Sequence, residues 1–118
     1  MYEDDPVRVY LNEICKIPPI TRDQEIACIR HVRDRDAQAE NAKKDLVEVN
    51  LHLVVSIAQR NPSDHVHILD LIQKGNDALL AAVQDFADGG GDNFSVYAAP
   101  CIERAVTEAI AASRPAVG

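Results

Sequence analysis

The stretch that decides the fold is ILDLIQKGNDALLAAVQDF, residues Ile68 to Phe86. Its apolar residues recur mostly at spacings of three and four, which places them on one face of an α-helix. The other face is densely polar, and Gly75 lies in mid-helix. A glycine there costs about 1 kcal/mol relative to alanine, so we expect it to permit the close approach of another backbone. The pattern predicts a helix with one face in a core and the other free to meet a partner.

The composition of the whole chain favours a single all-α domain. The chain has 118 residues, of which 47% are hydrophobic and only 4% aromatic. Helix-forming residues are abundant, and no sustained alternation of apolar and polar residues indicates strands. We therefore expect a compact helical bundle of about five helices that forms one domain over residues 1–118.

Charge and targeting signals narrow the class of protein. The formal net charge of -7 works against nonspecific nucleic-acid binding, which depends on lysine and arginine displacing phosphate counterions. No run is long and apolar enough for a membrane span, and the start lacks the parts of a secretion signal. We expect a cytoplasmic protein that does not enter a membrane. Cys15, Cys28 and Cys101 are too widely spaced for a zinc knuckle and are expected to be free thiols.

Capping signals predict two short helices at the start of the chain. Asp4 and Asp5 precede Pro6, an acidic cap followed by proline at the first helical position. Pro18-Pro19 ends this helix. Thr21 and Gln24 then match the capping box of a second helix.

The remaining boundaries follow from turn residues. Asp36 is expected to cap one long helix from about residue 37 to 60. Residues 87–93 read as a glycine-rich loop. Pro100 interrupts the last helix, and because an internal proline costs about 3 kcal/mol we expect a kink or a restart there. Arg114-Pro115 ends that helix.

At this point four motifs in order resemble bacterial RNA polymerase sigma factors of the housekeeping class. The resemblance covers Asp5 to about Ile110 and implies the central, core-binding and promoter-melting sigma domain with the short segment before it. Residues 5–33 would be that segment, 37–86 the core-binding helices and 94–112 the promoter-contacting helix. The motifs are DPVRVYL at 5–11, NLHLVVSIA at 50–58, DLIQKGN at 70–76 and FSVYA at 94–98.

The resemblance also implies two binding surfaces and no chemistry. In the family, the helix that contains residues 70–76 docks on a coiled coil of the polymerase beta-prime subunit, and the next helix contacts the unpaired promoter strand. No catalytic residue, cofactor or metal is implied. The implied polymerase-binding residues are Asp70, Gln73, Lys74, Asn76 and Asp77, and the implied DNA-binding residues are Phe94, Tyr97, Arg104 and Thr107.

The departures from the family pattern cluster in these two surfaces. The family's glutamate in the docking helix is Lys74 here, and its paired tryptophans are Pro100 and Cys101. Asn93, Glu103 and Glu108 replace expected basic residues, which weakens any contact with promoter DNA. Two interpretations stay open: an initiating sigma factor, or a non-initiating relative or decoy that binds polymerase or another protein without DNA. The chain is either a fragment or a short relative of a longer protein.

Two other residue clusters have competing interpretations. Asp64, His65, His67 and Asp70 carry imidazole and carboxylate groups that bind first-row metals, so a small metal-dependent hydrolase is a remote alternative. No positioned nucleophile or base completes such a site, and we expect no enzyme. The basic cluster is interpreted as a solvated helix end that complements the helix dipole. Its members are Arg30, His31, Arg33 and Arg35.

Overall fold

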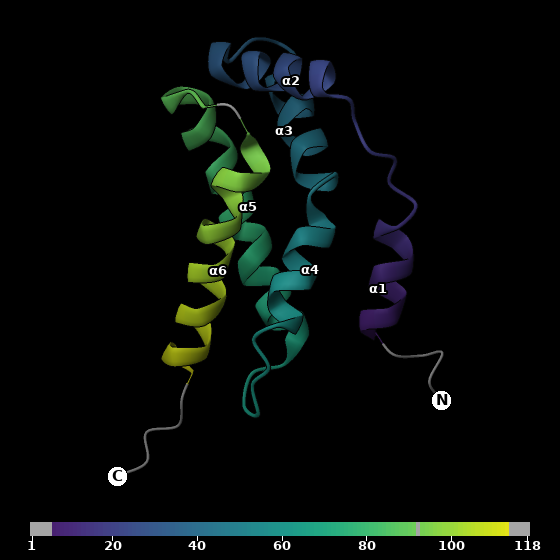
Figure 1. Cartoon of the computed structure of the whole chain (residues 1–118), viewed down its shortest axis with the longest axis vertical. Helices are drawn as coiled ribbons and strands as arrows, with labels where there is room; N and C mark the ends of the chain where they lie inside the picture. Colours follow the sequence, from purple (N-terminus) through teal and green to yellow (C-terminus); the bar gives the residue numbers. More distant parts are fainter. Residues whose placement is uncertain (1–5, 92, 114–118) are drawn as a thin grey trace.

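Six α-helices form the part of the chain that the computed structural model describes, residues 6–91 and 93–113 (Figure 1). This confirms the predicted all-α class. The expected start signal at Asp4 and Asp5 and the expected stop at Arg114-Pro115 lie outside the described residues. The helices are α1 (Pro6–Ile14), α2 (Arg22–Asp34), α3 (Ala39–Glu48), α4 (Leu51–Gln59), α5 (Ile68–Gly89) and α6 (Phe94–Ala112).

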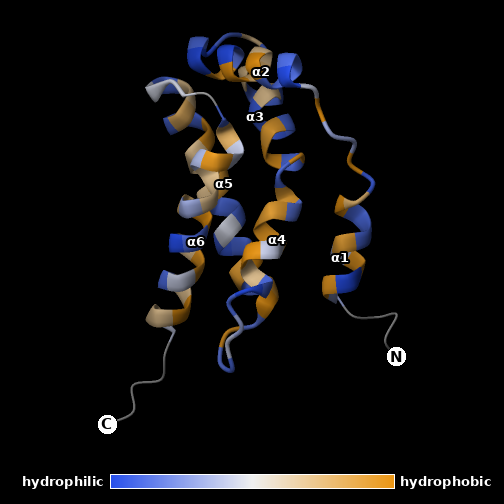
Figure 2. Ribbon diagram, viewed as in Figure 1, coloured by the Kyte–Doolittle hydropathy of each residue, from blue (hydrophilic) through white to orange (hydrophobic). Residues whose placement is uncertain are grey.

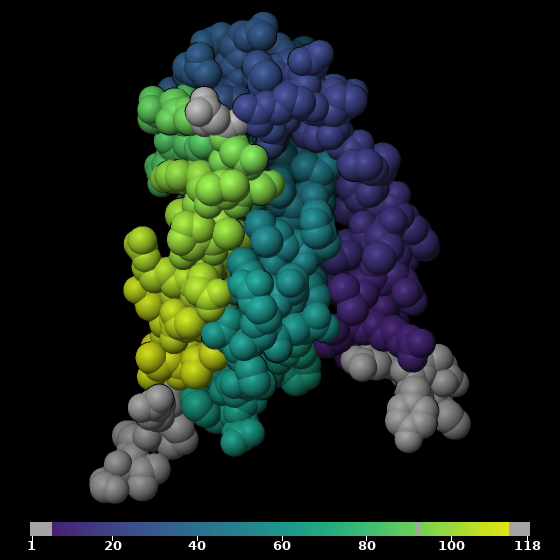
Figure 3. Space-filling view, viewed as in Figure 1, coloured from purple at the N-terminus to yellow at the C-terminus, as the bar shows by residue number. Residues whose placement is uncertain are grey.

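The helix that opened the sequence, α5, is the centre of the arrangement. It contacts each of the other five helices. Helix α2 lies across one end of the molecule, while α6, α4 and α1 stand side by side on the face seen in Figure 3. Every other helix is therefore positioned relative to α5.

The core is made mostly of aliphatic side chains, as the low aromatic content requires. Helix α4 consists mostly of hydrophobic residues, whereas α2 contains many hydrophilic ones (Figure 2). Burying such aliphatic surface contributes about 25 cal/mol per Å² and is the main force holding the helices together. The largest fully buried side chains include Phe94, Leu46, Ile57, Leu71, Leu79 and Ile102.

Gly75 allows neighbouring side chains, and not a backbone, to approach α5. A β-carbon built at this position would lie 2.6 Å from Cγ1 of Val54 and 3.2 Å from Cγ2 of Ile102. Both valine and isoleucine are stiff at χ1 and are fully buried here. Gly75 therefore does permit close packing, as expected. The groups that approach it are side chains of α4 and α6, whereas the sequence pattern predicts another backbone.

The expected long helix over residues 37–60 is wrong, because the chain breaks between α3 and α4 at Asn50. The side-chain Nδ2 of Asn50 donates to the carbonyl of Leu46 at 2.8 Å, and its backbone N–H donates to Val47. The Asn50 amide thus takes the carbonyl that a continuous helix would pair with the Asn50 backbone, a competition typical of asparagine. Its Oδ1 accepts a hydrogen bond from the Ser95 hydroxyl at 2.9 Å. Asn50 ties the break to the start of α6.

Two local expectations need correction. Asp36 does not cap α3: the N-cap is Gln38, and Asp36 instead accepts from the Gln38 backbone N–H at 2.9 Å. Of the kink or restart expected at Pro100, the restart is absent, because α6 runs through Pro100 as one helix. Pro100 and Val96 are both exposed, so water can satisfy the Val96 carbonyl that proline leaves unpaired.

The end of α2 is tied to the end of α5 by two arginines of the basic cluster. Arg33 Nε donates to the Ala87 carbonyl at 3.2 Å, and both terminal nitrogens of Arg35 donate to the Asp88 carboxylate at 3.3 and 2.9 Å. These cations meet the carboxyl end of α5, where a helix dipole favours positive charge. The sequence pattern assigns these cations to the dipole of their own helix. Arg33 and Arg35 instead complement the dipole of α5, the helix that they contact.

Asp88→Asn is expected to flatten the acid side of the stability profile. Hydrogen bonds from Arg35 hold the pKa of Asp88 below its ordinary value of 3.8 in the folded chain. A lowered folded pKa stabilises the fold above the unfolded pKa, and this contribution is lost as the pH falls through the folded pKa. Urea unfolding between pH 7 and pH 2 checks this. Asp85→Asn, on the same helix, should keep the wild-type acid dependence, and an unchanged profile in Asp88→Asn would contradict the pairing.

Candidate functional site

Four exposed polar residues of α5 form one line along the helix. Asp70, Gln73, Lys74 and Asp77 are all exposed, and their spacing puts them on one face over two turns. We call these four residues the α5 stripe. Gln73 Nε2 donates to Asp77 Oδ1 at 3.4 Å, and within the described part of the chain none of the four takes part in an ion pair. Their charges are thus available to an outside partner.

Asn76, the fifth residue predicted for polymerase binding, faces α1. It is half-buried, and its Nδ2 donates to the Tyr10 hydroxyl at 3.3 Å. Its Oδ1 is buried without a hydrogen-bond partner. The amide therefore holds α1 against the flank of α5 and does not lie with the exposed stripe.

The stripe begins directly after a side-chain cap. His67 is the N-cap of α5, and its Nδ1 accepts from the Leu69 backbone N–H at 3.0 Å. Asp70 follows in the first turn, where the helix dipole favours a carboxylate. The cap fixes where α5 starts and so fixes the position of Asp70.

His67→Ala is expected to lower the free energy of unfolding by about 1 kcal/mol, the usual cost of a lost N-cap. His67→Ser should retain most of the stability because serine accepts the same backbone N–H. Chemical denaturation measures both. His52→Ala, at an exposed position inside α4, serves as the control and should stay near wild type. Equal stabilities of the alanine and serine variants would refute a capping role.

Of the aromatic residues predicted to contact DNA, one is core and one is at the surface. Phe94 is fully buried and meets Phe86 edge-on at a centroid distance of 5.5 Å. Its ring is not exposed in this structure, so the predicted contact between Phe94 and DNA stays a prediction that would require the ring to leave the core. Tyr97 lies 5.4 Å from Phe86 and keeps 39% of its surface exposed. Tyr97 alone presents an aromatic surface from α6 to solvent.

The polar residues of α6 are only partly free. Arg104 and Thr107 are exposed, but the Thr107 hydroxyl donates to the carbonyls of Glu103 and Arg104 in its own helix. The Glu103 carboxylate accepts from Arg60 at 3.3 Å and from Asn61 at 2.7 Å. Glu103 therefore ties α6 to the end of α4.

Sequence reasoning missed a polar cavity beside the start of α6. Its volume is about 370 Å³, and its lining includes Asn50 and Ser95, whose side chains are hydrogen-bonded to each other. Asn50 is the one buried polar residue among the described positions, at 6% exposed. An asparagine at the head of the apolar run 50–58 was the available signal. The other lining residues are Pro19, Ile20, Thr21, Arg22, Glu25, Val49 and Asn93.

The residues of the metal-site alternative do not converge. Among the described residues, no group of three or more His, Cys, Asp or Glu side chains could hold a metal ion. His67 caps α5, while His65 Nε2 donates to the Ile110 carbonyl at 3.2 Å. Both imidazoles have structural tasks.

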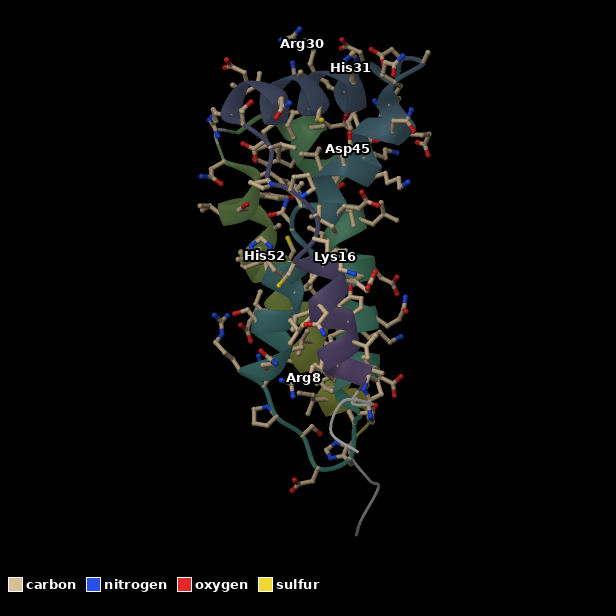
Figure 4. All side chains as sticks on the ribbon, turned by 90° about the vertical axis from the view of Figure 1, so that its right-hand side faces the viewer. Arg8, Lys16, Arg30, His31, Asp45 and His52 are labelled. Carbon is tan, nitrogen blue, oxygen red and sulfur yellow. The ribbon has the colours of Figure 1, made fainter. Side chains whose placement is uncertain are left out.

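The other two members of the basic cluster, Arg30 and His31, lie on α2 at one end of the molecule. Both side chains project from α2 (Figure 4). His31 pairs with Asp36 at 2.7 Å, and this hydrogen bond lowers the pKa of Asp36.

No helix in the described part of the chain is long and apolar enough to cross a membrane.

The described residues thus form an all-helical domain with an exposed polar stripe along α5. Residues 46–115 match the family described as Sigma-70 region 2, and residues 5–33 match Sigma-70 factor, region 1.2. The chain belongs to the sigma-70 family. That family consists of transcription initiation factors, which are not enzymes.

Relatives at moderate identity support the same assignment. The chain is 44% identical over 108 residues to the RNA polymerase sigma factor SigA of a Bacillus species, covering 92% of this chain and 28% of that protein. It is 45% identical to SigA of Clostridium acetobutylicum over the same shares, and 46% identical to SigA of Lactococcus lactis subsp. cremoris over 92% of this chain and 30% of that protein. The chain thus spans less than a third of the length of these relatives.

Proposed function

We propose that this chain docks on RNA polymerase core through the α5 stripe. The observation that supports this most directly is that Asp70, Lys74 and Asp77 are exposed along one helix face and form no ion pair with any residue that the structure describes. Surface charges that serve only solubility need no such alignment, whereas complementary charges fix the register of a docked helix. The partner that the family resemblance suggests is the coiled coil of the beta-prime subunit. Asn76 contributes by holding α1 beside the stripe.

The direct test is capture of core polymerase by the tagged chain. Wild type should retain the core enzyme, and an excess of isolated beta-prime coiled coil should release it. Failure of the folded wild type to retain core, with helical content verified by circular dichroism, would overturn the proposal.

A second part of the proposal is weak engagement of an unpaired promoter strand at the start of α6. Tyr97 offers a ring at the surface, and the cavity over Asn50 and Ser95 offers hydrogen-bonding groups to an unstacked base. The charge of α6 and the loop before it opposes DNA binding. Residues 87–113 contain one basic residue, Arg104, and four acidic ones. Repulsion of phosphates makes the binding weak and strongly dependent on salt.

Tyr97→Ala is expected to weaken binding of single-stranded promoter DNA by about 1 to 3 kcal/mol, the range for one base stacked on an aromatic ring. Fluorescence anisotropy at low salt measures the affinity. Val96→Ala, at the neighbouring and more exposed position, is the matched control and should bind as wild type does. A chain that binds polymerase core but shows no DNA binding at low salt would instead be a non-initiating relative. The buried Phe94 ring and the Glu103 carboxylate, which is held by Arg60 and Asn61, favour that alternative.

A further inference from the structure

The loop between α4 and α5 lines an open cavity at the surface. Residues 61–67 and the adjoining helix ends line a space of about 600 Å³, which is the size of a ligand pocket. We call it the loop pocket. Ala58 and Leu71, each 1% exposed, lie in its wall with the partly buried Val66 and Ile68. Polar residues also line the pocket, but most of its exposed surface is apolar.

Side-chain hydrogen bonds hold this loop in place although it contains no helix or strand. His65 Nε2 donates to the Ile110 carbonyl of α6, and its backbone N–H donates to the Ser63 hydroxyl at 3.3 Å. Asn61 Nδ2 lies 2.8 Å from the Ile57 carbonyl and 2.7 Å from Glu103. The pocket is thus formed before anything binds, which lowers the entropic cost of filling it.

The loop pocket adjoins the α5 stripe. His65 and Val66 line both the loop pocket and a second cavity of about 440 Å³, whose other walls include Asp70, Gln73 and Lys74. A helix docked on the stripe therefore lies beside residues that also line the loop pocket.

The loop pocket and the α5 stripe together carry a net negative charge. Asp64 lines the pocket, and Asp70 and Asp77 belong to the stripe; all three are exposed and take part in no ion pair among the described residues, against the single ammonium of Lys74. A basic partner is complementary to this combined surface. Exposed ion pairs contribute only about 0 to 1 kcal/mol each, so a polar stripe fixes register without supplying much affinity. Affinity comes from a desolvated anchor residue seated in a pocket.

We propose that the loop pocket receives an apolar side chain of the basic helix that docks on the α5 stripe. This rests on the proposed function, because it takes the docked polymerase helix as the partner. It adds the place where that helix is anchored: beside the amino end of α5, between Val66, Ile68 and Leu71.

The first measurement uses indole as the probe and needs no polymerase. In methyl-resolved NMR, indole should shift the signals of Val66, Ile68 and Leu71 in saturable fashion and leave Val106, in the core beneath Gly75, unmoved. Ala58→Leu, which extends a side chain into the cavity, should weaken the indole interaction at least tenfold. Absence of saturable shifts in wild type would overturn the pocket whatever the polymerase result.

The second measurement is the affinity for the beta-prime coiled coil. Val66→Ser and Val66→Asp should each weaken it at least tenfold, with the aspartate variant the weaker binder. Val96→Asp makes the same exchange at an exposed site on α6 and should stay within twofold of wild type. Val66 lies in the loop, so its variants keep the helical core even where Ala58→Leu fails to fold.

The outcomes separate the two claims. Wild-type affinity retained in both Val66 variants would overturn the anchor while leaving the docking proposal standing. Indole binding without any docking by wild type would instead overturn the proposed function and the assignment of this occupant.

Discussion

Gly75→Ala is expected to lower the free energy of unfolding by about 1 to 3 kcal/mol, the usual cost of overpacking a core. Alanine is the better helix former by about 1 kcal/mol, so propensity alone predicts the opposite sign. Packing wins because the added carbon would lie 2.6 Å from the Val54 methyl, and Val54, Ile102 and Val106 are all fully buried. The valine has no open space to rotate into. Urea denaturation at neutral pH measures the effect.

Gly89→Ala is the matched control on the same helix. Gly89 is the last residue of α5, and a β-carbon there would meet nothing within 4 Å. Removing glycine from a helix with no packing conflict stabilises it, so this variant should gain up to about 1 kcal/mol. Equal effects of the two substitutions would mean that contact with α4 and α6 does not decide the role of Gly75.

Helix periodicity and capping chemistry predicted most of the fold. The Thr21 and Gln24 capping box is present as expected, with both reciprocal hydrogen bonds. Such signals are local, because the cap and the backbone groups it satisfies lie within one turn. The helix over residues 68–86 likewise follows from its own spacing, and the structure extends it to Gly89.

The errors arose at residues whose role depends on their surroundings in the folded chain. Asn50 breaks the helix through its own amide, which pairs with the Leu46 carbonyl four residues back, and Ser95, 45 residues away along the chain, holds the Oδ1 of that amide. Pro100 stays inside α6 because that turn faces water, and exposure is a property of the folded state. No single stretch of sequence contains either fact.

The candidate site was predictable in residue type but only partly in placement. The α5 stripe follows from helical spacing, yet the same spacing could not show that Asn76 faces α1 or that Phe94 is buried beneath Phe86. The loop pocket has no sequence signature at all. It depends on the hydrogen bond from His65 to the Ile110 carbonyl, and these residues are 45 positions apart in the chain.

Charge reversal at Asp70 is expected to weaken docking on the beta-prime coiled coil about tenfold or more. In Asp70→Arg, an attraction to a basic partner becomes a repulsion at the first turn of α5, a change of about 1.4 kcal/mol for each factor of ten. Lys74→Glu should act in the opposite direction, because it restores a carboxylate between Asp70 and Asp77. Both effects should shrink at high salt, since exposed charges are screened.

Asp85→Arg is the charge-matched control for this experiment. It introduces the same change on the same helix at an exposed position beyond the stripe. An affinity within about twofold of wild type would show that position, and not net charge, determines the loss.

The most direct measurement of the central claim is isothermal titration of the beta-prime coiled coil into wild type, Asp70→Arg, Lys74→Glu and Asp85→Arg at low and high salt. Docking through the α5 stripe predicts that Lys74→Glu binds most tightly, wild type and Asp85→Arg bind alike, and Asp70→Arg binds most weakly. Wild-type affinity in Asp70→Arg, or weaker binding by Lys74→Glu, would contradict it.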